Sequence, residues 1–295
     1  MKIGFIGAGK VGCSLGKYFV QHGKEVGGYF SKNLQNAVWA KEFTKTKHYQ
    51  SLEDVIADNE VVFLTVPDRE IANVWSQLKQ FPLQQKIICH CSGSLSSAVF
   101  SDISRMEAYG YSVHPLFAVN SKENSYKELS QAIFTIDGSP DKAEFVMQML
   151  TSCGNKVLQI PGEKKTLYHA AAVTASNLVN GLLYMAQEML VDCGFHSQDA
   201  LEALSPLIRG NVDKALSVGL CEALTGPVER NDTTTVGAHM EMLSDRNGMA
   251  AAERHVLIPE SDQAQIYRLL SAQVLEIARE KHKDRDYKEM EELLR

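Results

Sequence analysis

A glycine-rich turn directly after the first apolar run most constrains how this chain folds. The run from Lys2 to Ile6 has the β-branched and aromatic character of a buried strand, and an amphipathic stretch through about Val20 follows the turn. Between them, G-x-G-x-x-G occurs at Gly7, Gly9 and Gly12. A strand, a glycine turn and a helix in this order predict an α/β sheet whose first turn binds the pyrophosphate of a dinucleotide.

Each glycine of the turn has its own physical task. Gly7 permits the tight turn, Gly9 lets the backbone approach a pyrophosphate, and Gly12 allows the helix to pack closely on the strand. The helix N-terminus adds partial positive charge. The candidate cofactor-binding residues in this turn are Gly7, Ala8, Gly9, Lys10, Val11 and Gly12.

Strand-like and amphipathic stretches alternate as far as Pro161, which predicts βαβ units and a doubly wound Rossmann sheet. The expected strands are residues 2–6, 25–30, 60–66, 86–90, 111–113, 132–136 and 156–160. After Pro161-Gly162 strand signals almost disappear, and the expected helices are residues 163–193, 197–218, 232–246 and 259–283. We therefore expect a dinucleotide-binding domain over residues 1–161 and an all-helical domain over residues 162–295.

Composition narrows the possible partners and compartment. The chain has 30 basic and 36 acidic side chains, a net charge of −6, which disfavours binding to nucleic acid. Its six cysteines have no paired spacing over 295 residues, so we expect no disulfide framework. The expected compartment is the cytoplasm, where thiols stay reduced. The three-residue cluster Cys89-His90-Cys91 divides between two strand faces, so no metal site is expected.

The segment Thr166–Gln187 contains no Asp, Glu, Lys or Arg and is long enough to cross a bilayer. Its polar side chains, among them His169, Asn177 and Asn180, would need partners in hydrocarbon, and no second spanning segment exists. We therefore expect no membrane insertion, and a helix buried by other helices or by a second subunit. A homodimer follows as an expectation.

The end of the second expected strand bears on the choice of cofactor. An acidic side chain there holds the ribose 2′-hydroxyl of NAD, whereas a 2′-phosphate favours hydroxyls and positive charge. This strand ends in Tyr29-Phe30-Ser31-Lys32, and no acidic residue occurs between Val26 and Lys41. Ser31 and Lys32 therefore favour NADP, although NAD remains open because the usual arginine is absent.

Several motifs together resemble those of a known superfamily. Beside the glycine turn, these are Val66-Pro67-Asp68, Cys91-Ser92-Gly93-Ser94 and an all-helical second half, which look like the superfamily of 6-phosphogluconate dehydrogenase and pyrroline-5-carboxylate reductase. More narrowly, His114-Pro115-Leu116, residues 168–172, Ser176-Asn177 and residues 226–232 resemble an uncharacterised Rossmann-like NADP oxidoreductase family. The resemblance implies a nicotinamide-dependent enzyme that often forms dimers, with Val66, Pro67 and Ser92 beside the cofactor.

Lys165 and His169 are the expected proton-transfer residues. They lie four residues apart, so both project from one helical face, and Ser176 returns to that face. In the hydroxyacid dehydrogenase relatives, a Lys followed four residues later by an Asn acts as acid or base, whereas here the second position is His169. The resemblance adds Asn177 to the candidate catalytic residues.

Three further residues are candidates for binding substrate. His114 precedes a proline at an expected strand end, Ser176 shares the face of Lys165, and Arg230 lies in a loop where it can clamp a carboxylate or a phosphate. The predicted function is hydride transfer between NADP and a small anionic keto or hydroxy acid or an imine. The alternative is a dinucleotide-binding sensor or regulatory protein without turnover.

Overall fold

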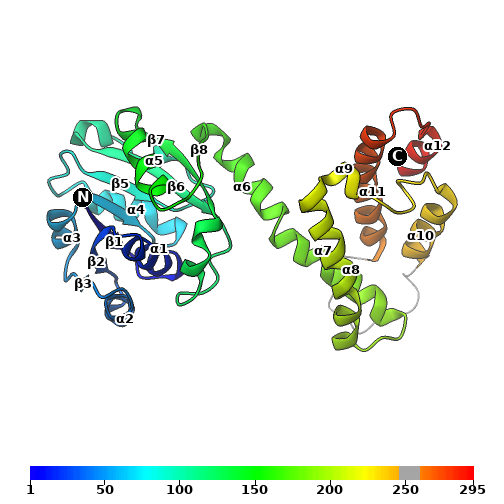
Figure 1. Cartoon of the computed structure of the whole chain (residues 1–295), viewed down its shortest axis with the longest axis horizontal. Coiled ribbons are helices and arrows are strands. Elements are labelled where there is room, and N and C mark those ends of the chain that lie inside the picture. The colour runs from blue at the N-terminus through cyan, green and yellow to red at the C-terminus, as the bar shows by residue number, and fades with distance from the viewer. Residues whose placement is uncertain (246–259) are drawn as a thin grey trace. The chain divides into compact units, whose positions relative to one another are not determined.

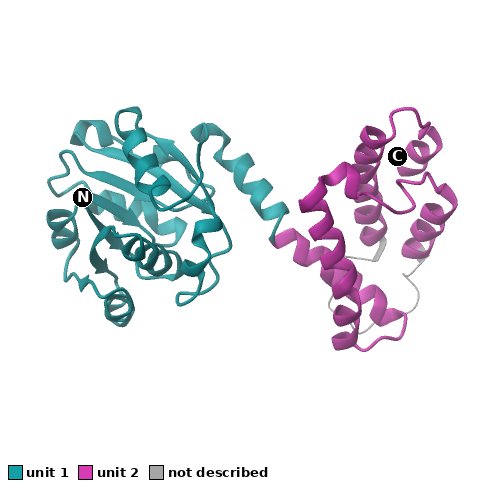
Figure 2. Ribbon diagram, viewed as in Figure 1, with its two compact units in different colours: residues 1–176 teal, residues 177–295 magenta. Residues whose placement is uncertain are grey.

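The computed structural model describes residues 1–245 and 260–295 and consists of two compact units, Met1–Ser176 and Asn177–Arg295 (Figure 2). The expected domain boundary lay after Pro161, fifteen residues before the division between the units. The intervening residues belong to the first unit because the first helical turn there, which begins at Lys165, is bonded to a loop of the sheet.

The first unit is built on an eight-stranded sheet with the order β3-β2-β1-β4-β5-β6-β7-β8 (Figure 1). The strands are β1 (Lys2–Ile6), β2 (Glu25–Phe30), β3 (Lys47–His48), β4 (Val61–Leu64), β5 (Ile87–His90), β6 (Tyr109–Leu116), β7 (Ile133–Gly138) and β8 (Val157–Gln159). Strand order reverses beside β1, which pairs in parallel with both β2 and β4. This is the switch point of a doubly wound fold, and the expected fold class is confirmed.

Two details of the sheet differ from the expectation. The two residues of β3 are too few to produce a periodic signal, so this strand was missed. The βαβ units expected from the alternating pattern imply parallel strands, but β7 runs antiparallel to β6. The chain between them has two short 3₁₀ turns, η3 (Ser125–Lys127) and η4 (Leu129–Gln131), and no crossover α-helix of the kind that parallel strands need.

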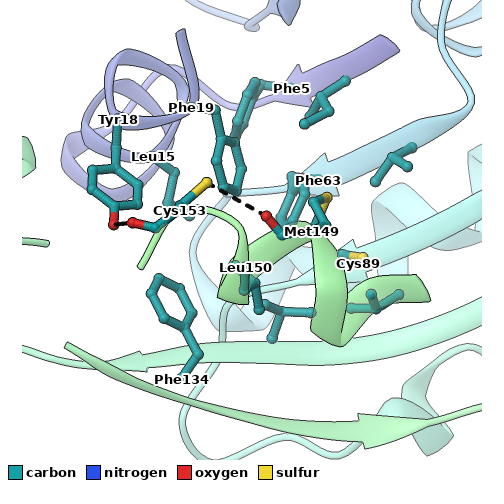
Figure 3. Packing of buried hydrophobic residues seen from close by; sticks show 14 of the residues in the cluster. Phe5, Leu15, Tyr18, Phe19, Phe63, Cys89, Phe134, Met149, Leu150 and Cys153 are labelled. Atoms are coloured by element: carbon teal, nitrogen blue, oxygen red, sulfur yellow. Dashed lines mark hydrogen bonds between the residues drawn. The ribbon is translucent and has the colours of Figure 1, made fainter. Parts of the chain in front are cut away.

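The sheet is buried on both faces. Phe63 belongs to a core cluster with Phe5 and Phe19, whereas its neighbours Val62 and Leu64 belong to a second cluster. Successive strand residues point to opposite faces, so the two clusters lie on the two sides of the sheet. In the first cluster Phe5 stacks on Phe63, with ring centroids 5.5 Å apart (Figure 3).

The helices of the first unit include the one that follows the glycine turn. They are α1 (Lys10–Gln21), α2 (Leu34–Thr44), α3 (Leu52–Asp58), α4 (Asp68–Leu78), α5 (Ala143–Thr151) and α6 (Lys165–Thr174). The expected single helix over residues 163–193 is wrong, because α6 ends at Thr174. The hydroxyls of Thr174 and Ser176 donate to the carbonyls of Ala170 and Ala172, a pattern that bends or interrupts helices.

The second unit is helical throughout its described residues. It contains α7 (Asn177–Asp192), α8 (Ser197–Val218), α9 (Leu220–Ala223), α10 (Thr233–Asp245), α11 (Glu260–Lys281) and α12 (Lys288–Leu294). The expected helix ends at Arg246 and Pro259 lie outside the described residues. A small core joins α10, α11 and α12 through Val236, Leu275 and Met290. No described helix combines the length and apolar character that crossing a bilayer requires.

Candidate functional site

The glycine turn leaves room for an anion at the N-terminus of α1. Gly7 has φ of +109°, and a Cβ there would lie 2.6 Å from the carbonyl oxygen of Thr65, so a side chain is excluded. A Cβ on Gly12 would lie 2.4 Å from Thr65 Oγ1, which shows how closely α1 approaches the loop after β4. A Cβ on Gly9 would meet no atom nearer than 3.9 Å, so this side of the turn is open.

Backbone donors face this open side. The backbone amide of Cys13 is the first in α1 to donate to a preceding carbonyl, that of Gly9 at 3.0 Å. The amides of residues 10–12 therefore come before the hydrogen bonds within the helix. The N-cap Gly9 supplies no side-chain acceptor for them. Unpaired amides at a helix N-terminus bind phosphate, and the open turn therefore fits the pyrophosphate of a dinucleotide.

The end of β2 carries the two residues that bear on cofactor choice. Ser31 Oγ accepts a hydrogen bond from the amide of Asn33, and Lys32 Nζ lies 3.3 Å from Glu70 Oε2 of α4. No sequence pattern indicates this distant carboxylate as a partner of Lys32. The Lys32 side chain is 72% exposed, so the ion pair is worth at most about 1 kcal/mol and Lys32 can exchange it for a phosphate.

The loops after β4 and β5 are tied together by Asp68, which sequence reasoning did not select. Val66 and Pro67 follow β4, and Asp68 then begins α4. Its Oδ2 accepts hydrogen bonds from Ser92 Oγ at 2.6 Å and from Ser94 Oγ at 3.2 Å. Ligands of doubly wound folds bind at the carboxyl ends of the strands, where these two loops lie.

Lys165 is almost fully buried, with 1% of the side chain exposed, at the start of α6. Its Nζ donates to the backbone oxygen of Ser92 at 3.1 Å, which holds α6 against the loop after β5. The pKa of Lys165 lies below its ordinary value because burial outweighs the attraction of Asp137, Cys91 and Asp68.

Two histidine rings converge on Gly93. A Cβ built on Gly93 would lie 2.6 Å from His169 Nδ1 and 2.9 Å from His114 Nε2, so only a glycine leaves space between the rings and the loop. His114 Nδ1 and the Tyr168 hydroxyl, 2.8 Å apart, share a hydrogen bond. His169 Nδ1 is buried and has no hydrogen-bond partner among the described residues.

Burial determines the charge of His114. Burial, together with the smaller effects of the nearby Lys165 and His169, lowers the pKa of His114 to about 4. At neutral pH His114 is therefore uncharged, and its hydrogen bond with Tyr168 orients the ring so that Nε2 faces Gly93. Tyr168 was not among the candidate site residues, although it belongs to the motif of residues 168–172.

The other candidate residues do not join this cluster within either unit. Ser176 ends the first unit and is exposed, with its hydroxyl donating to Ala172 O. Asn177 and Arg230 belong to the second unit, and both are exposed. Over residues 1–245 and 260–295, no three His, Cys, Asp or Glu side chains are grouped as a metal site.

Two family models match separate parts of the chain. Residues 2–92 match the family model described as NADP oxidoreductase coenzyme F420-dependent. Residues 132–274 match a domain of unknown function, DUF2520. No curated protein sequence matches the chain.

Solved structures resemble the chain over nearly its whole length. Protein TM1727 from Thermotoga maritima is 26% identical and matches with a TM-score of 0.75, covering 95% of this chain and 99% of that one. The 1-pyrroline-5-carboxylate reductase of Streptococcus pyogenes is 16% identical, with a TM-score of 0.60 and coverage of 94% and 98%. A reductive aminase from Aspergillus terreus, in complex with NADPH, is 15% identical, with a TM-score of 0.62 and coverage of 100% and 99%.

These matches confirm the resemblance to Rossmann-like NADP oxidoreductases. They also confirm the two-part fold. NADP, the expected cofactor, is the one named by the family description and contained in the reductive aminase structure.

Proposed function

We propose that the protein is an NADP-dependent oxidoreductase that transfers a hydride between the nicotinamide and a small anionic keto or hydroxy acid or an imine. The observation that carries this proposal is the convergence of Lys165, His114 and His169 on Ser92-Gly93. This cluster follows the carboxyl end of β5, at the sheet edge where doubly wound folds bind their ligands, and it belongs to the same unit as the glycine turn.

The chain contributes binding and orientation to the reaction. Residues 7–12 hold the pyrophosphate, Ser31 and Lys32 hold the 2′-phosphate, and Val66, Pro67 and Ser92 line the path toward the nicotinamide. When bound, NADPH supplies the hydride. The site residues at Gly93 then have to hold the substrate and complete its protonation.

His169 is the proton donor in this proposal. Hydride addition to the carbon of a C=O or C=N group leaves an electron pair on oxygen or nitrogen, and that atom takes the proton from His169. Its Nδ1 suits this role because it is buried, has no protein partner in the described chain and faces Gly93. His114, uncharged and oriented by Tyr168, positions the same substrate atom.

Lys165 acts through its charge. Bound to the Ser92 carbonyl, the ammonium group holds the loop beneath α6 and stabilises negative charge that develops on the substrate during hydride transfer. Ser176, Asn177 and Arg230 stay our candidates for the anionic group and the orientation of the substrate. Arg230 is exposed and its guanidinium suits a carboxylate.

The experiment compares hydride transfer with cofactor binding. A panel of keto acids, hydroxy acids and cyclic imines is tested by following oxidation of NADPH, and NADPH affinity is measured by fluorescence titration. Replacement of His169 by Ala should lower the hydride-transfer rate by about 10²–10⁴ and leave the Kd of NADPH almost unchanged. His196→Asn, at the exposed N-cap of α8, is the control and should retain full activity.

Two outcomes would contradict the proposal. Equal rates for His169→Ala and wild type would remove His169 as the donor. Tight NADPH binding without turnover of any compound in the panel would favour the alternative function, a dinucleotide-binding sensor or regulatory protein.

A homodimer is the second part of the proposal. The second unit leaves many large apolar side chains exposed along α7 to α9, among them Leu178, Tyr184, Leu207, Leu216 and Leu220. Exposed apolar surface of this extent is typical of protein interfaces, and a second copy of the chain is the partner we propose. Light scattering should give twice the monomer mass of 32.7 kDa.

Two substitutions that introduce charge on α8 test the dimer. The double variant Leu207→Glu and Leu216→Glu should be monomeric, because both side chains are more than 60% exposed and lie on α8. Leu34→Glu changes a leucine of the first unit that is 58% exposed, and this variant should stay dimeric. A monomeric wild-type protein would remove this part of the proposal.

A further inference from the structure

A row of three polar side chains crosses the sheet close to Lys165. In the strand register, His90 of β5 pairs with Ser112 of β6, and Ser112 pairs with Asp137 of β7. Directly opposed residues on neighbouring strands share one face, so the three side chains lie in one line on the same side of the sheet. All three are buried, with at most 5% exposed.

This row is connected to Lys165 through the loop after β5. The backbone oxygen of Ser92 accepts hydrogen bonds from both Lys165 Nζ and Ser112 Oγ, at 3.1 Å and 3.4 Å. Asp137 lies beside Ser112 in the row. A Cβ on Gly162, three residues before Lys165, would lie 3.4 Å from Asp137 Oδ1, so the segment that leads into α6 packs on this carboxylate.

The hydrogen bonds of Asp137 are incomplete. Its Oδ1 accepts from the amide of Ser97 at 2.9 Å, whereas its buried Oδ2 has no hydrogen-bond partner among the described residues. A buried carboxylate without a cation is costly, so a positive group is expected close to it. The residue also lines a cavity of about 330 Å³ together with Ser96, Ser97 and Gly162.

The nearby histidines do not supply that positive charge. His90 accepts from the amide of Ser92 through Nδ1, and its Nε2 therefore donates to the carbonyl of Ser96. Burial lowers the pKa of His90 to about 4, and it does the same for His114, so both rings are neutral at physiological pH. Lys165 is the remaining basic group of this buried layer. Burial lowers the pKa of Lys165, and the attraction of Asp137 is the largest of the effects that raise it.

We propose that Asp137 is a positioning residue whose carboxylate is the counter-ion of the buried Lys165 ammonium group and keeps Lys165 charged and bound to the Ser92 carbonyl. Its consequence for turnover rests on the proposed function. No ion pair of 4.0 Å or less joins the two side chains within the described chain, so their attraction acts through the buried layer, where water screens charges weakly.

Several other groups face Lys165 and share in its electrostatics. They are His90 of β5, His114 of β6, Asp68 of α4, Cys91 of the loop after β5 and Tyr168 of α6. His169 of α6 lies beside His114. Asp68 already accepts two serine hydroxyls, which satisfies one of its oxygens. Asp68 is exposed, whereas Asp137 is buried and its Oδ2 has no donor among the described residues.

The test is a direct titration of Lys165 in the whole protein. Nuclear magnetic resonance of ¹⁵N-labelled lysine side chains gives the pKa of Nζ, and the Lys165→Arg variant assigns the signal. In Asp137→Asn the pKa of Lys165 should fall by roughly 1–3 units, because a nearby opposite charge is removed. Asp137→Glu should restore most of the shift.

Glu163→Gln is the matched control. Glu163 lines the same cavity and lies two residues before Lys165, but it is exposed, so this variant should leave the pKa of Lys165 near the wild-type value. If Asp137→Asn does not fold, Asp137→Ser removes the same charge with a smaller side chain. An unchanged Lys165 pKa in a folded, uncharged variant would overturn the inference.

The activity profile separates this inference from the proposed function. If charged Lys165 supports turnover, the alkaline limb of kcat/KM should move to lower pH in Asp137→Asn by the same number of units as the measured pKa. A fall in the pKa without movement of the alkaline limb would support Asp137 as counter-ion and contradict the role of Lys165 in turnover.

Discussion

Replacement of Gly93 by Ala tests the arrangement of the site most directly, because the added atom would enter the space between the two imidazole rings. The new Cβ would lie 2.6 Å from His169 Nδ1 and 2.9 Å from His114 Nε2. Ordinary contact begins at 3.4 Å, so His169 has to move by about 0.8 Å, the difference between 3.4 and 2.6. His114 cannot move freely because Tyr168 holds its Nδ1.

The size of the effect follows from this displacement. A misplacement of about 1 Å at a reacting group costs on the order of 10²-fold in rate, so we expect kcat to fall by roughly that factor. Overpacking should also lower the free energy of unfolding by about 1–3 kcal/mol. The Kd of NADPH should change little, because the glycine turn lies on other loops of the unit.

Turnover of NADPH, fluorescence titration and denaturant unfolding measure the three quantities. Gly162→Ala is the control: its Cβ would lie 3.3 Å from Ser96 Cβ, about 0.1 Å short of ordinary contact, so activity should remain near wild type. If Gly93→Ala kept both full activity and full stability, the convergence of His114 and His169 on Gly93 would not describe the working site.

Two further outcomes are expected. Lys32→Asp should weaken NADPH relative to NADH by about 1 kcal/mol, the low end for a charge-assisted contact because Lys32 is largely exposed, and equal loss for both cofactors in fluorescence titration would contradict the assignment of the 2′-phosphate. Asp58→Asn should lower stability at neutral pH: the hydrogen bond from Lys2, then that from Tyr49, lowers the pKa of Asp58 to about 2 from 3.8. Wild-type stability from this carboxylate is therefore present above about pH 4 and is lost as pH falls toward 2, whereas the variant should lack this dependence. Denaturant unfolding at several pH values measures the difference, about 1 kcal/mol after allowance for exposure of a third of the side chain, and parallel curves for the two proteins would refute it.

Features that the sequence alone could determine are those encoded by neighbouring residues. The glycine turn predicts the strand, turn and helix around Gly7. The prediction succeeds because the backbone there needs a φ of +109°, which glycine adopts and residues with side chains rarely do. The apolar run from Val61 to Val66 predicts a strand covered on both faces, and the observed strand β4, Val61–Leu64, is buried throughout. Local patterning failed where the signal was short, as at β3, or where hydroxyl groups interrupt an otherwise continuous helix, as at Thr174.

The candidate site shows a similar division. Lys165 and His169 could be selected from the sequence because a spacing of four puts two side chains on one helical face. Their neighbours could not: Gly93 and His114 lie more than 50 residues away from them along the chain, and Asp137 belongs to a strand that gave no chemical signal. Such contacts arise only when the sheet brings β5, β6 and β7 side by side next to the first residues of α6. The burial that lowers the pKa of His114 and Lys165 is likewise a property of packing, because it depends on which distant atoms exclude water from each group.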